Sequence, residues 1–309
     1  MKILVTGANG FIGKSLIKFL DKKISEDEVI GVVKELNPSK FINNSRISFI
    51  EANLLNKNLE NILPKDIDVI IHLAGKPNTF LTSEESRQQF LENVKMTSNV
   101  LDFAEKTTAK RIIFSSSCYV YTNENKLPFN EKLTAVPSNS LGASKLASEA
   151  LLKAHSISKG VDVVCLRLFT VYGPNSREIQ FIPEAIKKIL SNEGPATFGN
   201  GSVERDFVFI DDVLEAFSSA IHKDISKQFI TLNIGSGIAC SIEKIVDILK
   251  ESINPNKKIV FAKEKAKDSQ VDPNHLADVS SAKKYLDWKP KTDIHLGLNI
   301  TIQSIRESN

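Results

Sequence analysis

The chain has 309 residues, of which 41% are hydrophobic and 25% charged, and its 40 basic and 37 acidic residues leave a formal net charge of +3. A chain of this length buries roughly three quarters of its unfolded surface, so it needs no disulfide or metal to fold. The charge is too mild to predict a nucleic-acid or membrane surface. Cys118, Cys165 and Cys240 lie far apart and form no CxxC pair, and the five histidines are scattered. This pattern disfavours a disulfide framework and predicts no metal site.

The first ten residues, MKILVTGANG, begin directly with a strand pattern and leave no room for a signal peptide. No apolar run approaches the roughly 18 residues that a membrane span requires. We therefore expect a soluble cytoplasmic protein.

Short apolar runs alternate with amphipathic stretches over the first two thirds of the chain, a pattern typical of a parallel sheet covered by helices. The expected strands are, in order, KILVT, EVIGVV, ISFIEA, DVIIHLAG, RIIFSSS and VDVVCLRL. Helices are predicted at FIGKSLIKFLDKK, where apolar residues recur at helical spacing, at Ser83 to Lys106 and at Leu141 to Ser158. Right-handed crossovers between these strands produce a doubly wound sheet.

After Tyr172 the pattern loosens, and stretches rich in turn residues separate smaller strand and helix units. We predict an α/β fold in which a Rossmann-type doubly wound parallel sheet is followed by a smaller C-terminal α/β substrate-binding lobe. The dinucleotide-binding domain is expected over residues 1–172, with a return around 206–235, and residues 173–309 are expected to form mainly the lobe. Since ligands bind outside the carboxyl ends of the strands, the lobe would cover that crevice.

The segment TGANGFIG places Gly7, Gly10 and Gly13 at three-residue intervals between a strand and a helix. The first glycine permits a tight turn, the second lets the backbone approach a pyrophosphate, and the third allows close packing of helix and strand. The pyrophosphate would lie on free N–H groups at the helix N-terminus. The spacing and its context predict dinucleotide binding.

Further motifs follow in a characteristic order: HLAG at 72–75, FSSSCYVY at 114–121, GASKLASE at 142–149, RLFTVYGP at 167–174, GNGSVERDFVFIDDV and ADVSSAKKYLDWKP. Together with Gly-x-x-Gly-x-x-Gly, they resemble the extended short-chain dehydrogenase/reductases, the NAD(P)-dependent nucleotide-sugar epimerases and dehydratases. The resemblance implies a UDP-, GDP- or dTDP-linked sugar as substrate. It also implies a homodimer formed through the helices at Ser83–Lys106 and Leu141–Ser158.

The resemblance also implies a set of cofactor contacts. An acid usually meets the adenosine ribose after the second strand, but here Lys34 suggests a 2′-phosphate while Glu35 follows at once, so NAD and NADP stay open. Asn53 and Leu54 stand where the family has an Asp-Leu pair that reaches the adenine, and an asparagine carbonyl can also accept a hydrogen bond. The remaining expected contacts are Gly7, Asn9, Gly10, Phe11, Ile12, Gly13, Leu73, Ala74, Gly75, Asn93, Lys145, Phe169 and Val171.

In the family a tyrosine and a lysine four residues apart share one helix face beside the nicotinamide. The lysine holds the ribose, the tyrosine takes the proton of the substrate alcohol, and a serine at the end of the fifth strand binds the same oxygen. By motif position the serine is Ser117 and the lysine Lys145, but the tyrosine position is Leu141. Leucine transfers no proton, and such assistance is typically worth about 10²–10⁴ in rate.

Three explanations for Leu141 stay open. First, the proton shuttle could have moved to Cys118 or Tyr119, in the positions where the family's dehydratases carry an Asp-Glu pair and its 3,5-epimerases a cysteine in the second. Either side chain could instead only pack. Second, catalysis could be lost while binding is retained. Third, the leucine could have been introduced to trap a substrate. Ser140 is a weaker base candidate, since it has no activating partner.

On the substrate side, GNGSVERDF resembles the segment in which an arginine grips the diphosphate, here Arg205, whose planar guanidinium suits phosphate oxygens. Arg177 and Lys267 are further candidate cations, and Asn175 and Phe181 are expected to line the sugar and base pocket. The leading hypothesis is transient hydride transfer at a sugar carbon, expected to be C4, with epimerase-like chemistry favoured because positions 118–119 lack the Asp-Glu pair. The alternatives are a non-catalytic binding protein and an NADPH-dependent reductase.

Overall fold

A parallel sheet lies at the centre of the computed structural model, which describes residues 1–23, 26–37, 44–78, 81–122, 125–225, 227–262 and 274–308. In the described part of the chain its strand order is β10-β6-β5-β4-β1-β2-β3. All neighbouring pairs are parallel. The strands are β1 (Lys2–Thr6), β2 (Glu28–Val33), β3 (Ile47–Glu51), β4 (Val69–His72), β5 (Arg111–Ser117), β6 (Asp162–Leu168) and β10 (Phe229–Ile234). This confirms the predicted fold class.

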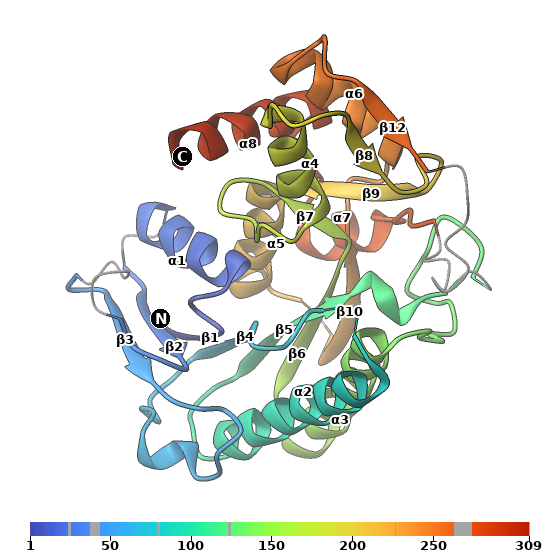
Figure 1. The fold of residues 1–309 in the computed structure, drawn as a ribbon. Coiled ribbons are helices and arrows are strands. Elements are labelled where there is room, and N and C mark those ends of the chain that lie inside the picture. Colours follow the sequence, from blue (N-terminus) through green and yellow to red (C-terminus); the bar gives the residue numbers. More distant parts are fainter. Residues whose placement is uncertain are drawn as a thin grey trace.

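Helices cover both faces of the sheet, as Figure 1 shows. The helices α1 (Phe11–Lys23) and α5 (Ile210–His222) lie on one face, and α2 (Ser83–Ala104) and α3 (Ser140–Lys159) lie on the other. Side chains alternate along each strand: Ile3 and Val5 belong to the core beneath α1 and α5, whereas Leu4 belongs to the core beneath α2 and α3. Burial on both faces explains why the strands are almost continuously apolar.

The ends of α2 and α3 follow from local sequence. Thr82 caps α2 in a reciprocal capping box with Glu85. Asn139 caps α3 by accepting a hydrogen bond from the amide of Gly142, and α3 ends at Gly160 in the left-handed conformation. These caps extend α3 by one residue at each end beyond the expected range, while α2 ends two residues earlier than expected.

A smaller lobe lies above the carboxyl ends of the strands (Figure 1). Its β7 (Thr170–Tyr172), β9 (Glu204–Phe209) and β11 (Ala239–Ser241) form one sheet, and β8 (Ala196–Phe198) pairs with β12 (Ile259–Phe261). The lobe also contains α4 (Phe181–Leu190), α6 (Ile242–Ile253) and α8 (Ile294–Ser308), whereas α7 (Ser280–Leu286) packs against β10. Two short 3₁₀ helices, η2 (Leu59–Asn61) and η3 (Cys118–Val120), complete the described elements.

The chain crosses between sheet and lobe more than once. It leaves the main sheet after β6, forms β7, α4, β8 and β9, returns through α5 to add β10 beside β6, and then enters the lobe again. The two parts therefore share a boundary along the carboxyl ends of β1, β4, β5 and β6, where an open α/β sheet binds its ligands.

Candidate active site

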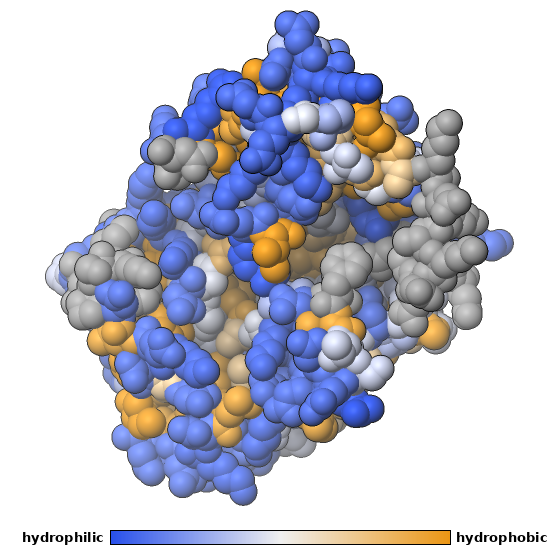
Figure 2. Space-filling model, in the orientation of Figure 1, coloured by the Kyte–Doolittle hydropathy of each residue, from blue (hydrophilic) through white to orange (hydrophobic). Residues whose placement is uncertain are grey.

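A cavity of about 990 Å³ opens at this boundary. Its walls come from the turns after β1 and β4, from the ends of β5 with η3 and of β6, from the first turns of α3, and from lobe residues between 169 and 207 with Ile242 of α6. Figure 2 shows the molecular face hollowed between sheet and lobe, with hydrophobic residues inside the hollow. A mixed apolar and polar cleft of this size suits a large organic ligand.

The glycine turn after β1 forms one end of this cavity. Gly7 has φ +69°, and a Cβ atom on it would lie 2.7 Å from the amide nitrogen of Ala74, so no other residue fits there without strain. The backbone amide of Lys14 donates a 2.9 Å hydrogen bond to the carbonyl of Gly10. This is the first backbone hydrogen bond of α1, so the amides of the three residues before Lys14 have no partner within the helix and stay available for a ligand. Phe11 and Ile12, two of these residues, line the cavity. The turn therefore offers an anion site at a helix N-terminus.

The other predicted cofactor residues divide into two groups. Leu73, Gly75, Phe169 and Val171 line the cavity with Gly10, Phe11, Ile12 and Lys145. The cavity wall, among the residues that the structure describes, does not include Gly7, Asn9, Gly13, Lys34, Asn53, Leu54, Ala74 or Asn93.

Two members of the second group have other roles in this structure, and a third is exposed. Asn93 holds the loop after β4, since its Oδ1 accepts a 2.8 Å bond from the amide of Lys76 and its Nδ2 donates to Ser144 at 3.0 Å. Asn53 closes a local turn by accepting a bond from the amide of Leu55. Lys34 is exposed beyond the end of β2.

Sequence reasoning missed a buried polar ladder behind the glycine turn. His72 at the end of β4 contacts Thr6 through Nδ1 at 2.8 Å and Thr97 through Nε2 at 3.2 Å, and Thr97 reaches Ser148 at 3.0 Å. Burial and the charge of Lys145 lower the pKa of His72 to about 3, so the ring is neutral. The ladder fixes the ends of β1 and β4 against α2 and α3.

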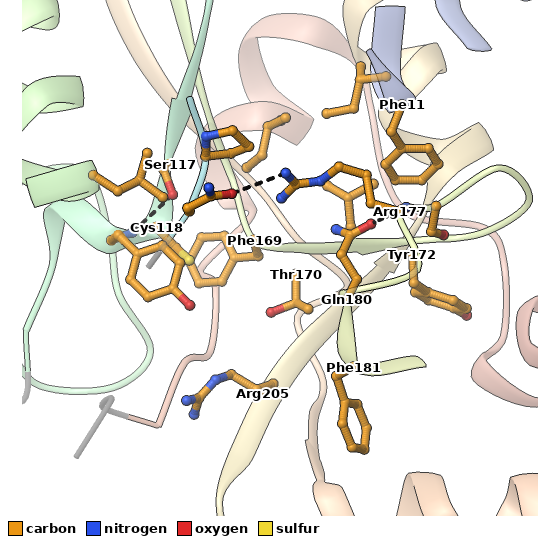
Figure 3. A pocket seen from close by; sticks show the side chains of 18 of the residues that line it. Phe11, Ser117, Cys118, Phe169, Thr170, Tyr172, Arg177, Gln180, Phe181 and Arg205 are labelled. Atoms are coloured by element: carbon orange, nitrogen blue, oxygen red, sulfur yellow. Dashed lines mark hydrogen bonds between the residues drawn. The ribbon is translucent and has the colours of Figure 1, made fainter. Parts of the chain in front are cut away.

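Ser117 is the last residue of β5 and caps η3. Its Oγ accepts a 3.3 Å hydrogen bond from the amide of Tyr119, and the half-buried side chain faces the cavity, as Figure 3 shows. A Cβ on Gly142 would lie 1.9 Å from the carbonyl oxygen of Tyr119, so a glycine is required for α3 to pack this closely on η3. The hydroxyl hydrogen of Ser117 remains able to donate to a ligand oxygen.

Leu141 and Lys145 lie one turn apart on α3, and both line the cavity. Leu141 is 5% exposed and adds an apolar wall where the family pattern predicts a phenol. The Nζ of Lys145 donates a 2.6 Å bond to the carbonyl oxygen of Ser115 and lies 4.7 Å from the centre of the Phe114 ring. Burial lowers the pKa of Lys145 to about 8, although the carboxylate of Glu149 opposes the shift.

A buried ion pair lies behind Lys145, and no sequence motif indicated it. Arg167 donates to both oxygens of Glu149, at 3.0 and 2.7 Å, and to the hydroxyl of Tyr121 at 2.8 Å. Tyr121 in turn donates to Asn233 on β10 at 2.9 Å. Both charged side chains are nearly inaccessible, at 6% and 4% exposure, so each needs the other. The network joins α3, β6, β10 and the C-cap residue of η3 behind the cavity wall.

Cys118 and Tyr119, the two residues of η3 that were candidates for a moved proton shuttle, both line the cavity. The Sγ of Cys118 lies 3.4 Å from Nδ1 of His275, a buried histidine from the segment before α7. The ring of Tyr119 meets the His275 ring edge to face, with centroids 5.3 Å apart. His275 stands 157 residues from Cys118 in the chain, and nothing in its neighbourhood NHLADV predicted this contact.

The lobe supplies the opposite wall of the cavity. Figure 3 shows Arg205 and Phe181 across the cavity from Ser117 and Cys118. Phe181, the first residue of α4, packs edge to face on Phe198. The predicted diphosphate residue Arg205 lines the cavity from β9.

Arg177 bridges the cavity mouth. Its guanidinium donates to Oδ1 of Asn78 at 3.2 Å, so a residue of the lobe contacts the loop after β4. Burial lowers the pKa of Arg177. Asn175 differs from expectation: it has φ +64°, is exposed, and is not part of the described cavity wall. The predicted Lys267 lies outside the described residues.

Comparison with known proteins decides the family. Residues 3–235 match the model of the NAD dependent epimerase/dehydratase family. The chain belongs to this family. A putative UDP-glucose 4-epimerase of Methanocaldococcus jannaschii is 31% identical, with 99% of each chain covered. The similarity to this relative extends over nearly the whole chain, including the lobe residues that follow residue 235.

Solved structures of this epimerase/dehydratase group agree. A UDP-glucuronic acid 4-epimerase of Bacillus cereus in complex with UDP-glucuronic acid and NAD superposes with a TM-score of 0.87 at 29% identity, covering 100% of both chains. MoeE5 in complex with UDP-glucuronic acid and NAD gives a TM-score of 0.88 at 28% identity, also over 100% of both chains.

Two negative observations accompany the epimerase/dehydratase assignment. Among the described residues, no three His, Cys, Asp or Glu side chains gather as a metal-ion site. Within the same part of the chain, no helix has the length and apolar character needed to cross a membrane.

Proposed function

We propose that this chain is an NAD-dependent nucleotide-sugar epimerase that acts on a UDP-linked sugar through transient oxidation at C4. One observation carries the proposal: a single cavity joins the glycine turn of α1, Ser117 and Lys145 on one side to Arg205 on the other. This arrangement can hold a dinucleotide and a second phosphate-bearing ligand with their reactive parts meeting at Ser117.

The cofactor end of the cavity fits a dinucleotide. The free amides of α1 suit the pyrophosphate, and buried Lys145 suits the nicotinamide ribose as a cationic donor. When bound, NAD would accept a hydride from the sugar carbon and return it within one turnover. The family description names NAD, and the structural neighbours above were solved with NAD. Lys34 is exposed, and the described cavity wall does not include it, so it provides no argument for a 2′-phosphate.

The lobe end fits the diphosphate and the sugar. Arg205 lines the wall opposite Ser117, and its planar donors match paired phosphate oxygens. Arg177 supplies a second cation at the mouth, while Phe181 provides an apolar surface. The neighbours with UDP-glucuronic acid and the UDP-glucose 4-epimerase relative support a UDP-linked sugar and C4 as the reacting carbon.

The proton step needs a group other than residue 141. Ser117 can orient the sugar hydroxyl, but a serine without an activating partner is a poor base. Cys118 and Tyr119 line the cavity next to Ser117 and are the proposed proton acceptors. Because neither is part of an Asp-Glu pair, epimerisation is favoured over 4,6-dehydration.

The test is a turnover assay. The purified chain with NAD is incubated with UDP-glucose, UDP-galactose, UDP-glucuronic acid and their N-acetyl analogues, and NMR follows the H1 signals of substrate and 4-epimer. Conversion of at least one sugar, with loss of conversion in Lys145→Met, supports the proposal. Binding of NAD and UDP-sugar by calorimetry without conversion of any sugar contradicts it.

That second outcome would favour a non-catalytic nucleotide-sugar-binding protein. Leu141 is the observation that supports this alternative, since it replaces the family's proton-transfer group by a hydrocarbon. Net oxidation of added NADPH, without a 4-epimer, would instead indicate a reductase.

We also propose a homodimer formed through α2 and α3. These helices carry exposed apolar side chains on the face away from the sheet, with Leu91 61% and Ile157 67% exposed. Light scattering should report twice the mass of the chain, and Leu91→Lys combined with Ile157→Lys should lower it toward the monomer.

A further inference from the structure

Cys118 and His275 form a buried pair at the edge of the cavity. Cys118 is 2% exposed yet belongs to the cavity wall, whereas His275 is 1% exposed and lies behind that wall. The Sγ of Cys118 and Nδ1 of His275 form a sulfur hydrogen bond, with 3.4 Å between the two atoms. The Nε2 of His275 has no hydrogen-bond partner among the described residues. A buried polar ring with one free nitrogen needs an explanation, because most buried polar groups are paired.

The surroundings keep the His275 ring neutral. Burial and the positive charge of Arg205 lower the pKa of His275 to about 3. A neutral ring carries one proton, either on Nδ1 or on Nε2. A proton on Nε2 would leave a buried N–H donor without a partner, which is the costlier choice. We therefore assign the proton to Nδ1, from where it donates to the sulfur of Cys118.

Backbone bonds hold this histidine firmly from both sides. Its amide donates to the carbonyl of Glu204 at 3.3 Å, and the amide of Ala277 donates to the carboxylate of Asp206 at 3.1 Å. The backbone amide of Phe129 donates to the carbonyl of Leu276 at 2.7 Å. The segment is thus fixed between β9 and the loop that follows η3, and its position does not depend on the Cys118 contact alone.

Resting on the proposed epimerase function, we propose that Cys118 is the base that replaces the missing tyrosine, and that His275 is its positioning residue. His275 donates Nδ1–H to the Cys118 sulfur and thereby stabilises the thiolate. A hydrogen bond to a charged acceptor favours the charged form.

Some of the charged groups around the pair favour ionisation of the Cys118 thiol, and others oppose it. Burial raises the pKa of Tyr121, next to η3, to about 12, so this phenol is neutral. Lys145 on α3 and Arg205 on β9 are cations that favour a thiolate, while the buried carboxylate of Asp206 opposes it.

The proton balance of the step is simple. The O–H bond of the sugar hydroxyl breaks and its proton forms the S–H bond of Cys118. The electron pair of the broken bond becomes the second bond of the ketone as hydride leaves the same carbon for the cofactor proposed above. In the reverse half, the thiol gives the proton back to the ketone oxygen as hydride returns, so neither Cys118 nor His275 is changed overall. His275 keeps its proton throughout.

Two substitutions separate the donor from the bulk of His275. His275→Asn keeps an amide N–H near the position of Nδ1, whereas His275→Leu removes the donor and keeps an apolar side chain. Cys118→Ser provides the reference without a thiol. Thermal melting of each variant confirms that it folds, and the His275→Asn variant keeps the test decisive if His275→Leu does not fold.

The first readout is independent of turnover. Thiolate absorbance at 240 nm is titrated between pH 5 and 9 in the NAD-bound protein, with the Cys118→Ser trace subtracted. Burial raises the pKa of Cys165 and Cys240, so their thiols do not contribute in this range. A charge-assisted hydrogen bond of about 1.5–3 kcal/mol predicts a Cys118 pKa that rises by about one to two units in His275→Leu and stays near the native value in His275→Asn. An equal Cys118 pKa in the native chain, His275→Leu and His275→Asn overturns the role of His275.

The second readout is the pH profile of kcat on the sugar that turns over. Its basic-group pKa should rise in His275→Leu and recover in His275→Asn, and Cys118→Ser should lose about 10²–10⁴ in kcat. Activity that falls with Tyr119→Phe but not with Cys118→Ser overturns Cys118 as the base. If no sugar turns over, the proposed function fails, while the 240 nm titration still decides whether His275 lowers the pKa of Cys118.

Discussion

Restoring a phenol at position 141 should rescue an enzyme that has lost the Cys118 thiol. Leu141 occupies the face of α3 that also carries Lys145, and both line a cavity of about 990 Å³, which has room for a larger side chain. A tyrosine there would lie one helical turn from the buried ammonium of Lys145. Because a nearby positive charge lowers the pKa of a phenol, the new side chain could accept the proton that Cys118→Ser can no longer take.

The size of the rescue follows from the value of one base. Loss of general-base assistance lowers kcat by about 10²–10⁴, which corresponds to about 3–5 kcal/mol in the barrier. Leu141→Tyr in the Cys118→Ser background should recover at least tenfold of this loss. The two substitutions should therefore be strongly non-additive, as expected for groups that serve the same step.

The assay is NMR turnover of the best sugar nucleotide by the native chain, both single variants and the double variant. Leu141→Phe in the Cys118→Ser background is the matched control, since it adds a ring without a hydroxyl and should recover nothing. A double variant no faster than Cys118→Ser would refute the reasoning about residue 141. A gain of a hundredfold or more from Leu141→Tyr alone would show that the native chain has no working base at Cys118.

Three further results are expected. Lys145→Met should weaken NAD binding about tenfold to a hundredfold, measured by calorimetry, and native affinity should fall as pH rises through about 8, where Lys145 loses its proton. Glu149→Gln should lower the free energy of unfolding by about 3–5 kcal/mol in urea titrations, because Arg167 is left buried without its partner, whereas the exposed Glu184→Gln should change it by less than about 1 kcal/mol. His275 has a pKa near 3 when folded against 6.5 as a free side chain, so the unfolded state binds the extra proton and stability is lost as pH falls below 6.5. The loss between pH 7 and 4 should be about 3 kcal/mol smaller in His275→Asn, and an equal loss in both proteins would contradict the neutral ring.

The glycine turn and the spacing on α3 were predictable because their geometry is local. The turn from β1 into α1 needs three glycines at fixed spacing. Glycine adopts a positive φ without strain, and Gly7 has such a φ. Leu141 and Lys145 share a helix face for the same reason, since a four-residue separation is about one helical turn. Ser117 was predicted from its position in the family motif, and the structure places it as the last residue of β5, at the carboxyl edge of the parallel sheet.

The substrate end was less predictable. Arg205 and Phe181 line the cavity, whereas Asn175 is exposed in the turn after β7 and has a left-handed backbone. The bond between Arg177 and Asn78 joins residues 99 positions apart, and it depends on how the lobe lies over the sheet.

The sequence by itself determined the first six strands of the sheet and the three helices between them, the glycine turn, and the absence of a phenol four residues before Lys145, since each depends on neighbours in the chain. The pairing of Cys118 with His275 and of Glu149 with Arg167 was decided only in the folded chain. The partners in each pair lie far apart in the chain, and although Cys118, Glu149 and Arg167 belong to sequence motifs, no motif indicated which residue each one contacts. Burial makes these contacts decisive, because a polar or charged group away from water depends on the partners that the packing brings within reach.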